Sequence, residues 1–147
     1  YLYIKNDQLG VHKDNEKIIK VIAGKFENAE GPEKGHNVDP IYFHVVLERD
    51  KEFKCDVPGG HNSFIYLLAG DLSVGKNKHD KTNNSNLILL DRGDKLIVKA
   101  NKKSEFLFIA GKPIGEPIAR GGPFVMNTKA EILQAIQDYH NGTFAKY

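Results

Sequence analysis

Short apolar or alternating runs, separated by turn residues, dominate the chain between residues 18 and 110. The clearest is 51–57, where Phe53, Cys55 and Val57 alternate with charged side chains, as in a strand with one buried face. The predicted strands are 18–24, 41–48, 51–57, 64–69, 72–74, 87–90, 96–100 and 106–110. Many short strands joined by turns predict a sandwich or a closed barrel, because closure protects the sheet edges.

Polar segments separate these strands. Segment 27–40 is rich in acids, glycine and proline and predicts a loop, and 101–104 predicts a turn. Segment 75–86 contains no apolar residue and predicts a long solvated hairpin loop. Its lysines could indicate a phosphate site, but the interspersed Asn, Asp and Ser favour a solvated loop: Lys76, Lys78 and Lys81.

One amphipathic helix is predicted after the last strand, over 127–141. Thr128 and Glu131 have the spacing of a capping box, in which each side chain bonds the other residue's backbone N–H. Gly142 can adopt the left-handed conformation that ends a helix. Four apolar side chains predict the buried face: Ile132, Leu133, Ile136 and Tyr139. The expected fold class is therefore all-β with one C-terminal helix.

Length and composition narrow the class of protein. A chain of 147 residues is large enough for one domain with a real core. The net charge of +2 gives no argument for a nucleic acid or a membrane surface as partner. Cys55 is the only cysteine, so no disulfide can form within the chain. The chain begins at Tyr1 rather than Met, and we expect a fragment or a processed product.

The segment 105–144 carries a resemblance to a known family. It reads EFLFIAGKPIGEPIARGGPFVMNTKAEILQAIQDYHNGTF: a buried strand, two X-Pro steps, a Gly-Gly-Pro turn and a capped helix. In this combination it resembles the C-terminus of the pirin family, whose members are two-cupin proteins. The resemblance implies that residues 1–147 form a single domain, a cupin-type β-barrel or jelly roll, and that an N-terminal cupin half is missing.

The same resemblance locates the positions that hold metal in the other half of such proteins. There, a His-x-His pair and a Glu precede an apolar strand ending in Tyr-x-Leu-x-Gly, and 66–70 (YLLAG) is the matching strand here. Counting back places the His-x-His positions on Asp56 and Pro58 and the Glu position on Asn62. The family pattern also includes one more histidine ligand, in a second motif later in the chain, and here 88–110 contains no histidine. The resemblance thus implies no metal or cofactor in this chain, and iron (Fe2+) in the missing half.

Few side chains remain as site candidates. His61, beside a Gly-Gly turn, is the candidate pocket residue, with an ordinary surface position as the alternative. His44 lies opposite Phe43 in the strand pattern and is expected to face solvent or another domain. Cys55 has no adjacent histidine to activate it and is expected to pack as a small apolar group. The other histidines are expected in surface loops or at the helix end: His12, His36, His79 and His140.

The proline-rich tail is the predicted contact with the missing half. Arg120, Phe124 and Met126 lie in an extended segment that a barrel does not need to close its own sheet. The alternative is that Phe124 and Met126 cover this chain's own barrel.

Two classes of function follow from the resemblance. Pirin-like proteins resemble quercetin 2,3-dioxygenases, which open a flavonol ring with O2 at iron in the first barrel. Others act as non-enzymatic transcriptional co-regulators that bind proteins. This chain is then a metal-free barrel that packs on the N-terminal cupin half, with regulatory proteins as further partners and no direct contact with nucleic acid or membrane. A cytoplasmic location is expected, or a nuclear one in a eukaryote. Fold alone does not separate dioxygenase from regulator.

Overall fold

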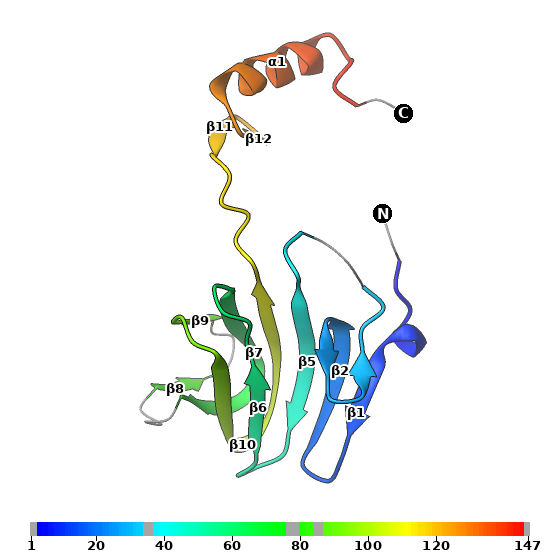
Figure 1. The fold of residues 1–147 in the computed structure, drawn as a ribbon, viewed down its shortest axis with the longest axis vertical. Helices are drawn as coiled ribbons and strands as arrows, with labels where there is room; N and C mark the ends of the chain where they lie inside the picture. Colours follow the sequence, from blue (N-terminus) through cyan, green and yellow to red (C-terminus); the bar gives the residue numbers. More distant parts are fainter. Residues whose placement is uncertain (1–2, 34–36, 76–79, 84–86, 146–147) are drawn as a thin grey trace. The chain divides into compact units, whose positions relative to one another are not determined.

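A computed structural model describes residues 3–33, 37–75, 80–83 and 87–145, with the backbone alone for 80–83. The chain divides into two compact units, Tyr1–Pro113 and Ile114–Tyr147. The first unit contains β1 to β10 and the second contains β11, β12 and the helix α1 (Figure 1). Whether the two units fold together as the predicted single domain 1–147 stays a prediction.

The first unit is built on one antiparallel sheet with the strand order β1-β2-β5-β10-β7-β8, to which β6 adds beside β10 and β9 beside β7. The strands of this sheet are β1 (Gly10–Lys13), β2 (Lys17–Ala23), β5 (Ile41–Leu47), β6 (Glu52–Asp56), β7 (Asn62–Val74), β8 (Asp80–Asn83), β9 (Leu87–Leu90) and β10 (Lys95–Gly111). The smaller elements are a 3-10 turn (Asn6–Gln8) and the hairpin β3 (Lys25–Phe26) and β4 (Ala29–Glu30).

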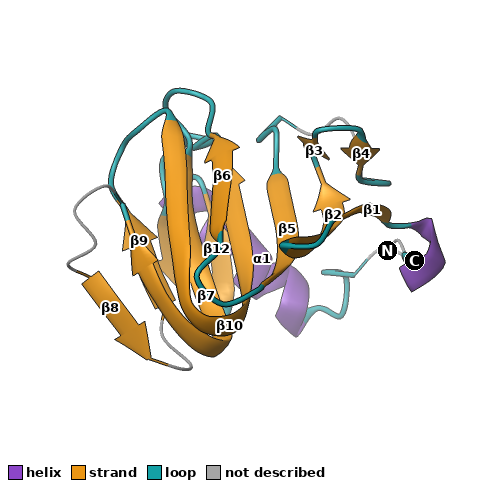
Figure 2. Ribbon diagram, turned by 90° about the horizontal axis from the view of Figure 1, so that it is seen from below, coloured by secondary structure: helices purple, strands orange, loops and turns teal. Residues whose placement is uncertain are grey.

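The two longest strands, β7 and β10, bend so that each serves two layers of the barrel (Figure 2). The first part of β10 pairs with β6, and its second part pairs with β5. The register between β7 and β10 shifts between Ala100 and Phe106, so the predicted turn over 101–104 is wrong. Bulges increase local twist and let a strand turn a corner without ending. The predicted strands 64–69 and 72–74 are therefore one continuous strand, β7. Likewise, the predicted strands 96–100 and 106–110 together form β10.

Aromatic side chains from three strands form the centre of the core. Phe43 on β5, Phe53 on β6 and Phe108 on β10 have no exposed surface. The Phe53 ring centroid lies 5.7 Å from that of Phe106 and 6.2 Å from that of Phe108, in edge-to-face geometry. Phe26, from the β3–β4 hairpin, stacks on Phe53 at 5.7 Å. Edge-to-face pairs add to the free energy gained by burying the rings.

Part of the polar segment 75–86 is strand, contrary to the prediction of a loop throughout. The backbone of Asp80–Asn83 pairs with residues 71–74 of β7. A ladder at the sheet edge needs only backbone N–H and C=O groups, so apolar periodicity cannot reveal it. Lys76, Lys78 and His79, like His36 in an earlier loop, lie outside the described residues, as does the side chain of Lys81.

The second unit is a two-stranded hairpin with a helix packed on it. Its elements are β11 (Ala119–Gly121), β12 (Phe124–Met126) and α1 (Lys129–His140). The predicted capping box is confirmed: Thr128 Oγ1 accepts from the Glu131 N–H at 3.2 Å, and Glu131 Oε2 accepts from the Thr128 N–H at 2.7 Å. The helix ends at His140, and Gly142 follows it with a φ of +71° and its N–H bonded to the Tyr139 carbonyl.

The buried face of α1 matches the predicted one only in part. Ile132 is buried and Ile136 half-buried, as predicted, and Ala135 is buried as well, whereas Leu133 is 69% and Tyr139 65% exposed. The helix rests on two strands of three residues each, and so small a platform covers only a narrow stripe of it. Gly121 permits the close approach, because a methyl group there would overlap the Ile132 side chain.

The predicted all-β class with one C-terminal helix is confirmed. Among the described residues, no helix combines the length and the apolar character that a membrane span requires.

Candidate functional site

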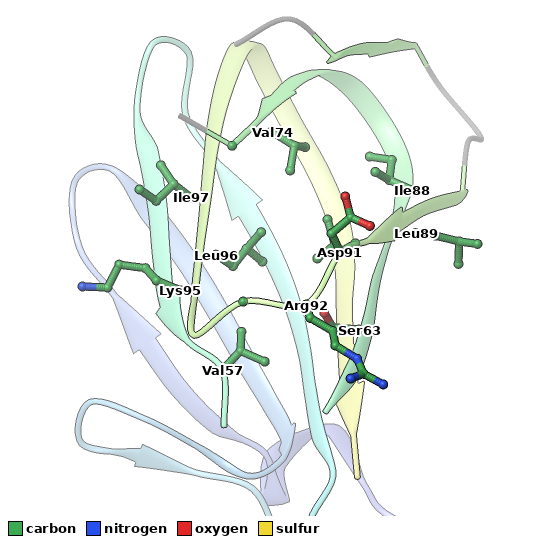
Figure 3. A pocket seen from close by; sticks show the side chains of 13 residues that line it. Val57, Ser63, Val74, Ile88, Leu89, Asp91, Arg92, Lys95, Leu96 and Ile97 are labelled. Carbon is green, nitrogen blue, oxygen red and sulfur yellow. The ribbon is translucent and has the colours of Figure 1, made fainter. Parts of the chain in front are cut away.

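A cavity of about 270 Å3 lies in the first unit, between β6, β7, β9 and β10 (Figure 3). Its apolar wall comes from different strands, which the barrel topology brings together: Val57, Val74, Ile88 and Leu96. Ser63, Asp91 and Arg92 add polar groups to its lining. The side chain of Leu89, between its inward-facing neighbours Ile88 and Leu90, points away from the cavity.

The residues counted as metal-ligand positions do not face this interior. Asp56, Pro58 and Asn62 are all exposed. Because side chains alternate along a strand, their neighbours point inward instead, and Val57 and Ser63 line the cavity.

These inward side chains do not supply a metal ligand set. Val57 and Leu96 have no donor atom, and a serine hydroxyl is a poor substitute for imidazole or carboxylate. No group of three or more His, Cys, Asp or Glu side chains that could hold a metal ion occurs in the described part of the chain. The residues that line this cavity therefore do not fit a cupin metal centre.

His61 is buried, with 8% of its surface exposed, but it is not part of the cavity lining. Its Nε2 lies 3.1 Å from the Asp39 carbonyl oxygen. A carbonyl only accepts, so Nε2 carries the proton and donates. Nδ1 has no hydrogen-bond partner among the described residues. His61 thus ties the start of β7 to the turn around Asp39, whose φ of +48° is left-handed.

Cys55 packs against the core, as predicted, with its thiol 3.2 Å from the Asp56 carbonyl oxygen. Burial, and secondarily the Asp56 carboxylate, raises the pKa of the Cys55 thiol to about 11. A thiol with so high a pKa is protonated at neutral pH and is a poor nucleophile.

The outer face of the sheet carries two rows of apolar side chains in register. One row crosses β5, β10, β7 and β9: Tyr42, Ile109, Phe64 and Leu89. The next row holds Leu107, Tyr66 and Leu87 beside His44. Leu89 is 77% and Leu87 56% exposed. We call these side chains the outer apolar face.

A hydrogen-bonded polar pair interrupts this face. His44 Nε2 lies 2.6 Å from Glu105 Oε1, across the β5–β10 pair. His44 therefore points away from the core, as predicted, and is held by a carboxylate.

In the second unit, the predicted contact residues point to different sides of the hairpin. Phe124 packs on the helix side, with ring centroids 6.0 Å from Tyr139 and 5.0 Å from Phe144. Met126 is half-buried. Arg120 and Val125 form a cross-strand pair on the opposite side, where Arg120 is exposed and Val125 is 61% exposed.

Residues 42–145 match the Pirin C-terminal cupin domain family. The chain belongs to the pirin family. It is 34% identical to a pirin-like protein of Caulobacter vibrioides over 146 residues, which is 98% of this chain and 52% of that protein. It is 32% identical to pirin of Homo sapiens over 145 residues, or 96% of this chain and 49% of that protein.

A solved structure supports the same assignment. Quercetin 2,3-dioxygenase from Acinetobacter baumannii superimposes with a TM-score of 0.83 at 29% identity, covering 97% of this chain and 50% of that one. The predicted cupin-type jelly roll is thereby confirmed. The pirin-family chain spans about half the length of the curated relatives it matches.

The cavity of this pirin-family barrel was not predicted from the sequence. Its lining is scattered between residues 57 and 97 and converges only through strand pairing. The one local signal is the apolar run Leu87–Leu90, in which every second side chain faces inward, followed directly by the charged residues Asp91 and Arg92.

Proposed function

We propose that this chain is the metal-free C-terminal barrel of a two-barrel, pirin-like protein and packs on an N-terminal barrel that holds Fe2+. The outer apolar face is the observation that carries the proposal. Soluble monomers seldom leave large contiguous apolar patches uncovered, and such patches are typical of interaction surfaces. The matched relatives are about twice as long as this chain, so a second barrel is a fitting occupant.

The polar pair on this face is compatible with a contact within one protein. His44 and Glu105 hydrogen-bond one another, so a surface that covers them does not have to supply a partner for either side chain. The surrounding Leu and Tyr side chains then supply the apolar area.

The tail is proposed as a second contact with the N-terminal half. From the sequence, the predicted contact residues are Arg120, Phe124 and Met126. Arg120 and Val125 are the side chains that the hairpin leaves exposed, and they are better placed to bind a partner than Phe124, which packs on Tyr139.

The whole protein is proposed to be quercetin 2,3-dioxygenase-like, in keeping with the name of the Acinetobacter structure. Its proposed location is the cytoplasm, or the nucleus in a eukaryote. This chain contributes no metal ligand in that proposal. Its role is to cover and position the metal-bearing barrel. A non-enzymatic co-regulator, as the alternative, would use the same pairing of barrels without ring opening.

The test expresses the N-terminal half of the full-length protein together with this chain as a separate piece. Leu89→Asp should abolish copurification, because it places a charge on the most exposed apolar side chain of the proposed contact. Leu133→Asp is the matched control, since Leu133 is also exposed but lies on α1, outside the strands that form the outer apolar face. Circular dichroism confirms that both variants fold. Equal copurification of all three forms would refute the contact.

Activity is tested on the full-length protein. Bound iron together with O2-dependent consumption of quercetin supports the dioxygenase. Bound iron without consumption favours the co-regulator, and no bound iron contradicts both forms of the proposal.

A further inference from the structure

We propose that the cavity between β6, β7, β9 and β10 binds a small aromatic monocarboxylate that carries a hydroxyl group at its far end. The aromatic body would lie among the apolar side chains, the carboxylate at Arg92 and the hydroxyl at Asp91. Leu89 belongs both to the lining of this cavity and to the outer apolar face, but none of the proposed ligand contacts uses it, and the site does not depend on an N-terminal barrel.

The apolar wall is preformed. Val57 and Leu96 are buried, and Val74 and Ile88 are half-buried against the same core. In Figure 3 these four side chains approach the cavity from different strands. A volume of about 270 Å3 lies just below the usual range for small-molecule pockets, roughly 300–1,000 Å3. One aromatic ring suits this space better than a fused ring system does.

Arg92 supplies the unmatched charge. Within the described residues its guanidinium makes no ion pair or hydrogen bond, whereas Nζ of the neighbouring Lys95 lies 3.6 Å from Asp56 Oδ1. A guanidinium presents a planar fork of donors that matches a carboxylate. The Ser63 hydroxyl lines the same cavity and likewise has no hydrogen-bond partner in the described structure. The Arg92 guanidinium and the Ser63 hydroxyl are therefore both available to bind a ligand in the apolar cavity.

Asp91 sets the second requirement. Its carboxylate also lines the cavity, so a ligand with two negative groups would be repelled. A carboxylate accepts hydrogen bonds strongly, and a ligand hydroxyl opposite the acid group would donate to it. The arrangement thus favours a monocarboxylate that carries a hydrogen-bond donor at its other end.

The experiment titrates the isotopically labelled chain with 4-hydroxybenzoate and follows amide shifts by NMR. Saturable shifts are expected at the cavity residues, among them Gly93 and Leu96. Arg92→Gln should raise Kd about tenfold or more, as expected for losing a charged hydrogen bond. Arg49→Gln is the matched control, because it removes the same charge from an exposed site remote from the cavity lining. Benzoate should bind more weakly than 4-hydroxybenzoate, and 4-hydroxybenzamide should lose the dependence on Arg92.

A second variant tests the space itself. Ile88→Trp should fill the cavity and abolish binding while the spectrum keeps its folded dispersion; Val74→Phe serves the same purpose if the first variant does not fold. The proposal is overturned if no saturable shift occurs below about 10 mM, a limit that corresponds to very weak binding. It is also overturned if Arg92→Gln and Arg49→Gln weaken binding equally, or if a folded, filled variant binds as the wild type does.

Discussion

Gly70 and Ser104 meet at the corner where β7 and β10 bend. Gly70 has a φ of +108°, and a methyl group built on it would overlap the Ser104 side chain and lie 2.5 Å from its Cα. Ser104 Oγ accepts from the Asp71 N–H at 3.0 Å and lies 2.7 Å from the Lys102 carbonyl oxygen. The buried hydroxyl therefore satisfies backbone groups that the bulges remove from the ladder.

Gly70→Ala should destabilise the barrel strongly, because the added methyl group meets both a left-handed φ and occupied space. Gly60→Ala is the control, since Gly60 has a φ of +85° with nothing within 4 Å. We expect the free energy of unfolding to fall by about 1–3 kcal/mol more for Gly70→Ala than for Gly60→Ala, the usual cost of overpacking. Urea denaturation measures both, and equal losses would contradict the role of the corner.

The second unit should depend on its cap and on one helix face. Thr128→Ala should cost about 0.5–2 kcal/mol through loss of the capping box. Ile132→Ala should cost about 2–5 kcal/mol, because Ile132 is buried against the hairpin. Leu133→Ala is the surface control and should be nearly neutral. The helical circular dichroism signal in urea reports all three, and a larger loss for Leu133→Ala would mean that another surface covers that side of α1.

Cys55 should react slowly with alkylating agents in the native protein. Its pKa of about 11 leaves little thiolate at pH 8. The rate with iodoacetamide should rise steeply only as the pH approaches that value. In a Cys55→Ser background, Lys54→Cys places a thiol at an exposed neighbouring position and should react much faster at pH 8. Similar rates for the two thiols would contradict the burial of Cys55.

Asp14 should make stability sensitive to acid. The Glu16 backbone N–H donates to its carboxylate at 2.7 Å, and this bond is the main reason that the pKa of Asp14 lies well below its usual 3.8. His12 and Lys17 lower the pKa further. Because the pKa is lower in the folded state than in the unfolded state, the ionised group stabilises the fold above about pH 4. That stabilisation is lost as the pH falls.

Unfolding measured between about pH 5 and pH 2 tests this linkage. Asp14→Asn keeps an oxygen acceptor for the turn but removes the charge. The free energy of unfolding should fall less steeply with decreasing pH in the variant than in the wild type. Parallel curves would show that Asp14 does not contribute to the acid sensitivity.

Local patterns determined a large part of this structure. Alternation over 51–57 predicted β6, and the spacing of Thr128 and Glu131 predicted the start of α1, because both depend on neighbours along the chain. The tail motif pointed to the family by the same kind of short-range signal.

Features that depend on residues distant in sequence were decided only by the tertiary structure. The segment 101–104 has the composition of a turn, yet it continues β10 because Ser104 bonds to Asp71 on a strand more than thirty residues away. Val57, Ile88 and Leu96 line one cavity because strand pairing fixes which alternate side chains face inward, a shift of one residue from the counted metal positions. The exposure of Leu133 likewise follows from the small size of the hairpin beneath α1, which no periodicity within the helix encodes.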